Sequence, residues 1–389
     1  MPTPRGWALL GSGLALIALW YAFGDQELLL AGAFLTTAQL FAVAYVRARP
    51  PLLSVGRGLG STAVHDGDTV GVTLVVRNRG RVPLRNVALS DEVSDLGRAS
   101  FLVARLRGGE AVSAAYRVVC RRRGAYRVGP AVGAASDPLG LAELPAAAGP
   151  EDRLVVYPAV ERLAGLPTSG GGDPAMSASR PERSGRGGED FYTLREYQRG
   201  DDLRRVHWPY SAKTDTLMIR QLETPRRSRA LVLLDARPQA YESPAAFEKA
   251  VSGAASVVTH LVSAGVDADL WAGGPGPVNA SRYAATMERL ALAALNPGLD
   301  IVAAATRIRR EAGGGALVLV TGSADRDLLS VQRLLSNKYG ATVMMGASSA
   351  SSPAVGDFHR LGVAVVTVAP NEDWAPAWGS AMRSMWAGG

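Results

Sequence analysis

The hydrophobic pattern divides the chain into stretches with different periods. Near the start, residues 7–23 and 28–46 contain no charged side chain over 17 and 19 residues. Each run approaches the length of about 20 residues that a helix needs to cross a bilayer. Only "GDQE" separates the two runs, which is enough for a tight turn. The pattern therefore predicts a transmembrane helical hairpin within residues 1–50.

One apolar run behind a basic residue is also the pattern of a secretory signal peptide. The second run, and the lack of an Ala-x-Ala cleavage pattern between the two, favour the hairpin. Arg5 precedes the hairpin and Arg47, Arg49 and Arg57 follow it, whereas its turn carries two carboxylates. The positive-inside rule then puts both ends in the cytoplasm. We expect a two-pass protein of the inner (cytoplasmic) membrane, with the bulk of the chain cytoplasmic.

Residues 51–160 show short stretches with a period of two. In "TVGVTLVVRN", residues 69–78, Val70, Val72, Leu74 and Val76 fall on one face, and the residues between them fall on the other. "AVSAAYRVVCRRRGAYRVGPAV" predicts two strands joined at "RRRG", where Gly124 supplies the turn. Such strands without helices are typical of a β-sandwich of roughly 100 residues. No catalytic constellation stands out there, so we expect a spacer or an interaction module.

Residues 161–188 interrupt this pattern and are expected to form a flexible loop or linker. The part "TSGGGDPAMSASRPERSGRGG" is rich in Gly, Ser, Pro and Arg and has no apolar period. "GRGG" is similar to part of a phosphate-binding loop. No strand precedes it and no Lys-Ser or Lys-Thr pair follows it, so a P-loop is excluded.

From residue 229 onward, apolar runs alternate with helix-length stretches. "RALVLLDAR", residues 229–237, has the character of a strand buried on both faces. Ser243 and Pro244 suit the N-cap and first position of a helix over 243–264. Further strands are expected near 267–272, 316–323, 341–348 and 362–369, and further helices near 283–295, 300–312, 325–339 and 373–386. The alternation predicts an α/β doubly wound domain with a mostly parallel sheet.

Ligands of such sheets bind beyond the carboxyl ends of the strands. The predicted strands bring one group of polar side chains to that edge, which we term the strand-end face: Asp235, Arg237, Thr321, Ser323 and Asp325.

The stretch "EDFYTLREYQRGDDLRRVHWPYSAK", residues 189–213, holds five acidic and five basic residues with aromatic residues between them. Buried charges persist when they are paired, so the balance favours an internal ion-pair lattice with Tyr197 and Trp208 packed beneath it. The alternative is a docking or ligand surface formed by Glu189, Arg195, Asp201, Arg204 and Lys213. His207 has no nucleophile at a suitable spacing, so a structural role is expected for it.

Composition limits the function classes. Only three of the 42 basic residues are lysines, a bias that GC-rich bacterial genes produce, so abundant arginine is no argument for nucleic-acid binding. The net charge of +7 suits an anionic membrane surface equally well. Cys120 is the only cysteine and is expected to be a buried small residue.

The membrane pair, "RRRGAYRVGP", "SDPLGL", the central motif and "LVLLDAR" together resemble the bacterial family called domain of unknown function 58. The resemblance implies a C-terminal domain similar to a von Willebrand factor A domain, within residues 189–389. It also implies a MoxR-type AAA+ ATPase as partner, with a transglutaminase-like membrane protein as a second one. The motif residues that match are Arg195, Tyr197, Gly200, Asp201, Arg204, Trp208, Ser211, Ala212 and Leu217.

The same resemblance bears on metal binding. Von Willebrand A domains bind Mg²⁺ through an Asp-x-Ser-x-Ser loop, which reads "DARPQ" here, so Arg237 and Gln239 replace the serines. The guanidinium would take the place of the cation, and too few oxygen ligands remain for octahedral Mg²⁺. We expect a degenerate metal loop at Asp235, without a metal or another cofactor.

Two functions remain open. The first is a membrane-tethered, non-enzymatic interaction or scaffold protein that acts with the ATPase, for example in cell-envelope assembly or chaperone-like maturation. The second is a nucleotide- or small-ligand-binding enzyme that uses the strand-end face. We favour the first and assign no catalytic residue, because the chain offers no convincing nucleophile, metal cluster or phosphate loop.

Overall fold

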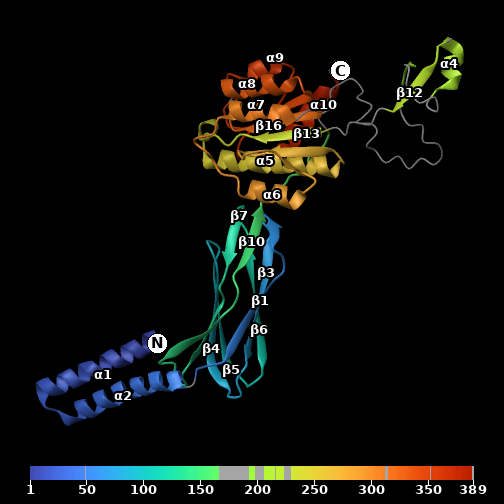
Figure 1. Ribbon diagram of the computed structural model, residues 1–389. Coiled ribbons are helices and arrows are strands. Elements are labelled where there is room, and N and C mark those ends of the chain that lie inside the picture. Colours follow the sequence, from blue (N-terminus) through green and yellow to red (C-terminus); the bar gives the residue numbers. More distant parts are fainter. Residues whose placement is uncertain are drawn as a thin grey trace. The chain divides into compact units, whose positions relative to one another are not determined.

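The computed structural model describes residues 1–48, 50–165, 192–197, 206–214, 216–222, 229–311, 314–350 and 352–387 (Figure 1). The chain forms two compact units, Met1–Ala159 and Val160–Gly389. The first holds a helical hairpin and a β-domain, and the second holds an α/β domain and a small hairpin module.

Two apolar helices, α1 (Pro4–Phe23) and α2 (Gln26–Ala48), form the hairpin. Gly24 ends α1 with a φ of 76° in the left-handed region, which glycine adopts readily. Gly13 and Gly32 permit close approach of the helices, because a Cβ on Gly32 would lie 2.8 Å from the carbonyl oxygen of Gly13. Both helices are long and apolar enough to cross a membrane, as the sequence predicts.

The β-domain consists of two sheets. The smaller has the order β1-β3-β6 and the larger has the order β2-β10-β7-β4-β8-β9, with β5 paired to β4. The strands of the smaller sheet are β1 (Leu53–Leu59), β3 (Thr69–Asn78) and β6 (Ala111–Val119). Those of the larger are β2 (Ala63–His65), β4 (Leu84–Val93), β5 (Gly97–Leu106), β7 (Gly124–Val128), β8 (Val132–Ser136), β9 (Glu143–Ala148) and β10 (Asp152–Tyr157).

Apolar side chains from both sheets pack into shared cores. In β3, every second residue is buried, from Val70 to Asn78, as the alternation predicts. Leu74 packs in one cluster with Leu89 of the other sheet. Cys120 lies fully buried in a second cluster, as expected, and burial together with the charges of Asp68 and Asp66 raises the pKa of its thiol.

Arg57 does not belong to the charges that flank the helical hairpin. The sequence placed it among the charges that flank the membrane, but its side chain is fully buried in the β-domain. Its Nε donates to Asp91 at 3.0 Å and its Nη1 donates to Asp152 at 2.9 Å. Because this charge is compensated internally, the positive-inside asymmetry rests on Arg5 and Arg47 among the described hairpin flanks.

The turn between β8 and β9, within "SDPLGL", joins the hairpin to the β-domain. Asp137 closes the turn by accepting a hydrogen bond from the backbone nitrogen of Ala142 at 2.6 Å. The carbonyl oxygen of Leu141 accepts from the backbone nitrogen of Thr3 at 2.9 Å and from Nε2 of the buried Gln39 at 3.4 Å. Both helices are thereby tied to one turn.

The α/β domain is built on a six-stranded sheet with the order β15-β14-β13-β16-β17-β18, in which only the edge strand β15 is antiparallel. Its strands are β13 (Arg229–Leu234), β14 (Asp267–Trp271), β15 (Val278–Asn279), β16 (Gly314–Thr321), β17 (Tyr339–Ala347) and β18 (Ala364–Val368). Its helices are α5 (Pro244–Ser263), α6 (Tyr283–Ala291), α7 (Ile301–Glu311), α8 (Arg326–Ser336), α9 (Val355–Arg360) and α10 (Trp374–Ala387), and a 3₁₀ turn, η2, spans Pro238–Ala240.

Helices cover both faces of this sheet, as predicted. Figure 1 shows α7, α8 and α9 on one side and α5 on the other. Leu231 and Leu233 of the central strand pack into the cluster formed with α7, α8 and α9. Ser243 caps α5 by accepting a hydrogen bond from Ala246, which confirms the predicted start of that helix.

The structure differs from the predicted elements at α6, α8, α9 and β15. The helix predicted over 325–339 ends at Ser336, and Tyr339 already begins β17. The sequence predicts a helix over 283–295, but α6 ends at Ala291. The backbone nitrogen of Asn296 donates to the carbonyl oxygen of Ala236 at 2.7 Å, which draws the chain toward the sheet edge. The short elements α9 and β15 were not predicted, because six and two residues are too few to show a period.

The start of the predicted linker, residues 161–165, packs against the α/β domain. Glu161 forms an ion pair of 2.8 Å with Lys249 of α5. The carbonyl oxygen of Gly165 accepts a hydrogen bond from Nε1 of Trp378 on α10 at 3.2 Å. Residues 161–165 therefore contact the α/β domain, while the remainder of the predicted linker, 161–188, lies outside the described residues.

Candidate functional site

The strand order of the α/β sheet reverses direction between β13 and β16. The chain runs from β13 outward to β14 and β15, then returns to β16 on the other side of β13. Connections that diverge in this way leave a crevice at the carboxyl ends of the two strands, which is the usual ligand site of open α/β sheets. Asp235 follows β13 and Thr321 ends β16, so both border this crevice.

The side chain of Arg237 fills the crevice and is 2% exposed. Its Nε and Nη2 donate to the two carboxylate oxygens of Asp235, at 3.0 and 2.8 Å. Its Nη1 lies 2.9 Å from a carboxylate oxygen of Asp325 and 2.9 Å from one of Asp327. One guanidinium thus links a fully buried carboxylate to two carboxylates at the rim.

Protein donors occupy the carboxylate of Asp235. Oδ1 accepts from the backbone nitrogen and Nε of Arg237, and Oδ2 accepts from Nη2 of Arg237 and Oγ1 of Thr321. A carboxylate offers about four lone-pair sites, so these four donors saturate it. Burial would lower the pKa of Arg237, but its hydrogen bonds with Asp235 and Asp325 raise it above the usual value, so the guanidinium stays charged.

The rim of the strand-end face is acidic. Asp325 is the N-cap of α8 and accepts from the backbone nitrogen of Leu328 at 2.8 Å. The side chains of Asp325 and Asp327 are 37% and 61% exposed. Glu242 follows η2 and accepts hydrogen bonds from Ser349 and Ser348, which lower the pKa of its carboxyl group. Asp325 and Asp327 therefore lie at the edge of the filled crevice, and Glu242 lies on the loop after η2, bonded to the segment that follows β17.

The structure brings together four of the five residues predicted for this face: Asp235, Arg237, Thr321 and Asp325. Ser323 contributes through its backbone instead, since its nitrogen donates to the carbonyl oxygen of Ala240 at 2.8 Å. Sequence reasoning missed Asp327 and Glu242. In "SADRD", Asp327 stands two residues after Asp325, and this spacing could have indicated a second carboxylate at the same edge of the sheet.

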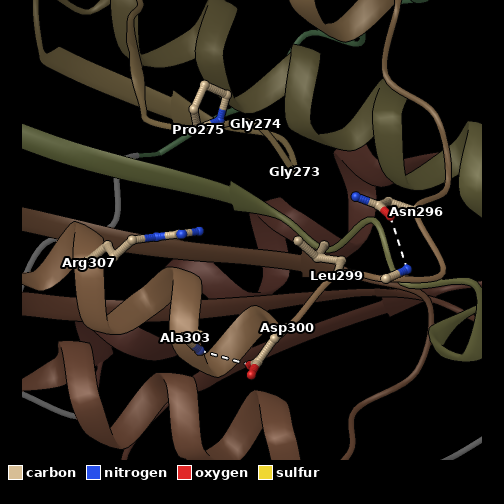
Figure 2. Close-up of a pocket in the computed structure, with 9 residues that line it drawn as sticks. Gly273, Gly274, Pro275, Asn296, Leu299, Asp300, Ala303 and Arg307 are labelled. Carbon is tan, nitrogen blue, oxygen red and sulfur yellow. Dashed lines mark hydrogen bonds between the residues drawn. The ribbon is translucent and has the colours of Figure 1, made fainter.

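A cavity of about 370 Å³ lies beside this face, between the loop after β14 and the start of α7 (Figure 2). Two of its polar side chains serve the backbone: Asp300 accepts from Ala303 at 2.8 Å, and Asn296 accepts from Gly298 at 3.0 Å. The cavity is lined by Gly273, Gly274, Pro275, Asn296, Gly298, Leu299, Asp300, Ala303 and Arg307.

The central motif is described only in part, as a small hairpin module. Its elements are β11 (Tyr192–Glu196), antiparallel to β12 (Met218–Leu222), and α4 (Trp208–Thr214). Arg195 lies opposite Ile219, and the backbone nitrogen of Tyr197 donates to Leu217 at 2.7 Å. Glu189, Gly200, Asp201 and Arg204 lie outside the described residues, so the proposed ion-pair lattice and the docking surface stay predictions.

The side chains on and beside α4 differ in their exposure. Ser211 is buried, and its Oγ accepts from the backbone nitrogen of Met218 at 2.8 Å. Trp208 was predicted to pack beneath the ion pairs, but its side chain is 65% exposed. Lys213 is exposed. Nδ1 of His207 accepts from the backbone nitrogen of Tyr210 at 3.1 Å, which is a structural role.

Among the residues that the structure describes, no group of three or more His, Cys, Asp or Glu side chains is arranged to hold a metal ion. Asp235 is the residue that a metal loop would use, and its oxygens bind Arg237 and Thr321 instead.

Comparison with known proteins gives two sequence matches. The model of a family described as "Protein of unknown function DUF58" matches residues 193–333, which include most of the hairpin module and the strands β13, β14, β15 and β16 of the α/β sheet. The chain is also 28% identical over 221 residues to the uncharacterized protein YeaD of Bacillus subtilis (strain 168). The match covers 55% of this chain and 54% of YeaD, so the chain spans about half the length of this curated relative.

Two of the solved structures that match illustrate a distant likeness. The CARDB domain of the PF1109 protein from Pyrococcus furiosus, solved with di-metal ions, shows 15% identity and a TM-score of 0.23, covering 27% of this chain and 93% of that chain. The sporulation control protein Spo0M from Bacillus subtilis shows 19% identity and a TM-score of 0.19, covering 27% of this chain and 49% of that chain.

Proposed function

We propose that this protein is a membrane-tethered, non-enzymatic interaction protein that acts with a MoxR-type AAA+ ATPase at the inner face of the cytoplasmic membrane. The family model that matches residues 193–333 is described as a protein of unknown function, so the partner is proposed from the resemblance of the sequence motifs. We propose further that the α/β domain is von Willebrand A-like. Asp235 at the end of the first strand, next to the switch point, supports this view.

The anchoring part of the proposal rests on α1 and α2. In the most apolar 18-residue stretch of α1, only 11% of the residues are buried within the protein, and in that of α2 only 22% are buried. A core helix of a soluble protein buries its apolar face against its own chain, whereas these faces need another apolar environment. A bilayer supplies it.

The observation that carries the interaction role is the position of Arg237. A catalytic or cation site at the switch point needs room for a substrate or open oxygen ligands. Here a buried side chain occupies that room and saturates the carboxylate. The remaining surface carries the carboxylates of Asp325 and Asp327 at the rim and of Glu242 on the loop after η2, which are complementary to a basic patch on a partner. The choice of a MoxR-type ATPase, with a transglutaminase-like membrane protein as second partner, rests on the family resemblance.

The test uses the full chain in nanodiscs and the purified ATPase encoded beside it. We expect direct association, with a rate that falls several-fold for Asp327→Lys, since rim charges act mainly on association rates. Glu151→Lys, which makes the same charge change on an exposed turn of the β-domain, is the control and should leave the rate unchanged. Absence of association with the unaltered chain would contradict the proposal.

A ligand-binding or enzymatic role is the second candidate, and the cavity beside the switch point favours it. Its volume of about 370 Å³ falls within the range of small-molecule sites. This role predicts that native mass spectrometry of the purified full chain detects a bound small molecule. It also predicts that Ala303→Trp, which fills the cavity, abolishes that binding while the protein keeps its melting temperature.

A further inference from the structure

One end of the β-domain carries a group of exposed arginines on two neighbouring turns. The first turn joins β3 to β4 and the second joins β5 to β6. The arginines on and beside them, here called the basic turns, are all exposed: Arg77, Arg79, Arg81, Arg85, Arg105 and Arg107.

The basic turns lie close to the end of the second membrane helix. The backbone nitrogen of Arg79 donates to the carbonyl oxygen of Leu52 at 2.7 Å. Leu52 follows the end of α2 at Ala48 by four residues, which can span at most about 14 Å. The first basic turn, which is bonded to Leu52, is therefore held within about 20 Å of the helix end.

A single buried residue fixes the two turns to each other. Asn78 is 1% exposed, and its Nδ2 donates to the carbonyl oxygens of Val82 and Leu106, at 2.8 and 3.2 Å. Its own carbonyl oxygen accepts from the backbone nitrogen of Gly109 at 2.9 Å. The arginines are thus presented from a rigid support rather than from a loose tail.

The charge of the basic turns is not compensated locally. Within the described part of the chain, no ion pair joins any of these six guanidinium groups to a carboxylate, whereas Arg57, Arg98 and Arg237 are all paired. The acidic residue of the second turn, Glu110, accepts from the backbone nitrogen of Arg107 at 2.6 Å. A ligand of the opposite charge is needed, and guanidinium groups bind phosphate in a bidentate manner.

We propose that the basic turns bind the phosphates of anionic phospholipids, so that this end of the β-domain docks on the cytoplasmic leaflet. The inference rests on the proposed membrane anchoring, which places the turns at the bilayer surface. Clusters of four to eight basic residues next to a membrane helix are attracted to anionic headgroups, and the attraction acts within about one Debye length. Val82 is 59% exposed between Arg81 and Pro83 and provides an apolar tip for the interface.

The test places an environment-sensitive fluorophore at either end of the β-domain in the full chain. Val82→Cys reports on the first basic turn. Val119→Cys is the matched control, because Val119 pairs with Thr69 at the opposite end of β3 and is 47% exposed. Cys120→Ala, combined with each, removes the native thiol. Each protein is incorporated into nanodiscs of phosphatidylcholine, with or without phosphatidylglycerol.

We expect phosphatidylglycerol to shift the emission of the probe at residue 82 to the blue and to leave the probe at residue 119 unchanged. High salt should reverse the shift. Arg79→Glu with Arg81→Glu should abolish it, whereas Arg121→Glu with Arg122→Glu, the same charge reversal on the exposed turn between β6 and β7, should preserve it.

Equal emission in the two lipid mixtures would overturn the proposal, as would a shift that survives the reversal of Arg79 and Arg81. A shift produced in neutral nanodiscs by an oligonucleotide, but not by phosphatidylglycerol, would assign the basic turns to nucleic acid instead. Extraction of membranes with alkaline carbonate tests the anchoring separately. A chain without a membrane anchor would be released, whereas an anchored chain would remain in the membrane.

Discussion

At the scale of single residues, Arg237 determines what the strand-end face can do. Its guanidinium donates two hydrogen bonds to the buried carboxylate of Asp235, which compensates the buried positive charge. A buried ion pair contributes little over an apolar pair, but loss of one partner leaves an uncompensated buried charge. Substitutions at the buried centre of the crevice are therefore expected to lower the stability of the fold more than substitutions at its exposed rim.

The first prediction follows from this difference in burial. Asp235→Ala should lower the free energy of unfolding of the α/β domain by about 3–5 kcal/mol, because Arg237 stays buried without its main partner. Asp327→Asn, at a side chain that is 61% exposed, should cost less than about 1 kcal/mol. Urea unfolding of the full chain in detergent measures both. An equal loss of unfolding free energy in the two variants would contradict the claim that the buried pair contributes more to stability than the exposed one.

Metal independence is a second prediction at this scale. The melting temperature should be the same with Mg²⁺, with Mn²⁺ and with a chelator, because ligands that bind only the folded state raise it and Asp235 is already saturated. Thermal scans under the three conditions test this. A metal-dependent rise that Asp235→Ala removes would establish a working site.

The sequence predicted those residues of the site that follow a buried apolar run. Asp235, Arg237 and Thr321 were predictable, since each stands at the end of a buried apolar run and parallel strands end at one edge. The network of Arg57 with Asp91 and Asp152 was not predictable, because its members come from three strands whose pairing has no local pattern. Glu242 was missed for the same reason, since its partners Ser348 and Ser349 follow another strand.

At the scale of elements, the helical hairpin depends on close backbone contact at Gly13 and Gly32. A side chain at Gly32 would meet the carbonyl oxygen of Gly13 and the backbone nitrogen of Ile17, neither of which can rotate away. Small residues are the usual means of close helix packing in membranes. The hairpin is therefore expected to be a packed unit and not two independent anchors.

The third prediction tests that contact. Gly32→Leu should destabilise the helix pair by about 1–3 kcal/mol, because overpacking forces the backbones apart. Gly11→Leu is the matched control, since no atom lies within 4 Å of a Cβ at that position. Thermal loss of helical circular dichroism, followed for the full chain in detergent, compares them. Similar melting of both variants would contradict the close contact.

Element prediction succeeded where the apolar period was long and failed where it was short. The alternation in β3 was predictable because it runs over ten residues, and the cap of α5 was predictable because Ser243 and Pro244 stand together before a long helical pattern. The end of α6 was set by the hydrogen bond from Asn296 to Ala236, a contact between segments far apart in the chain. Boundaries of this kind follow from tertiary structure and not from propensity.

At the scale of the whole molecule, the proposed arrangement requires the β-domain and the α/β domain to face the cytoplasm. Arg5 and Arg47 flank the hairpin on that side, while Asp25 and Glu27 lie at its turn. The basic turns add positive charge on the same side of α2. Each of these features favours one orientation.

The fourth prediction concerns this orientation. A fluorescent protein fused after Gly389 should fluoresce, because it folds in the cytoplasm, and alkaline phosphatase fused there should be inactive. Active phosphatase at that site would show that the C-terminus lies outside the cytoplasm, where an ATP-dependent partner could not act.

The central claim is that this protein holds a MoxR-type ATPase at the membrane, and cell fractionation tests it most directly. Membrane and soluble fractions are prepared from cells with the protein, without it, and with the Asp327→Lys variant. The amount of the neighbouring ATPase is then measured in each fraction. We predict that the ATPase is found in the membrane fraction with the unaltered protein, is lost from it in the deletion and is reduced by the variant. An ATPase that stays soluble whether or not the protein is present would contradict the account.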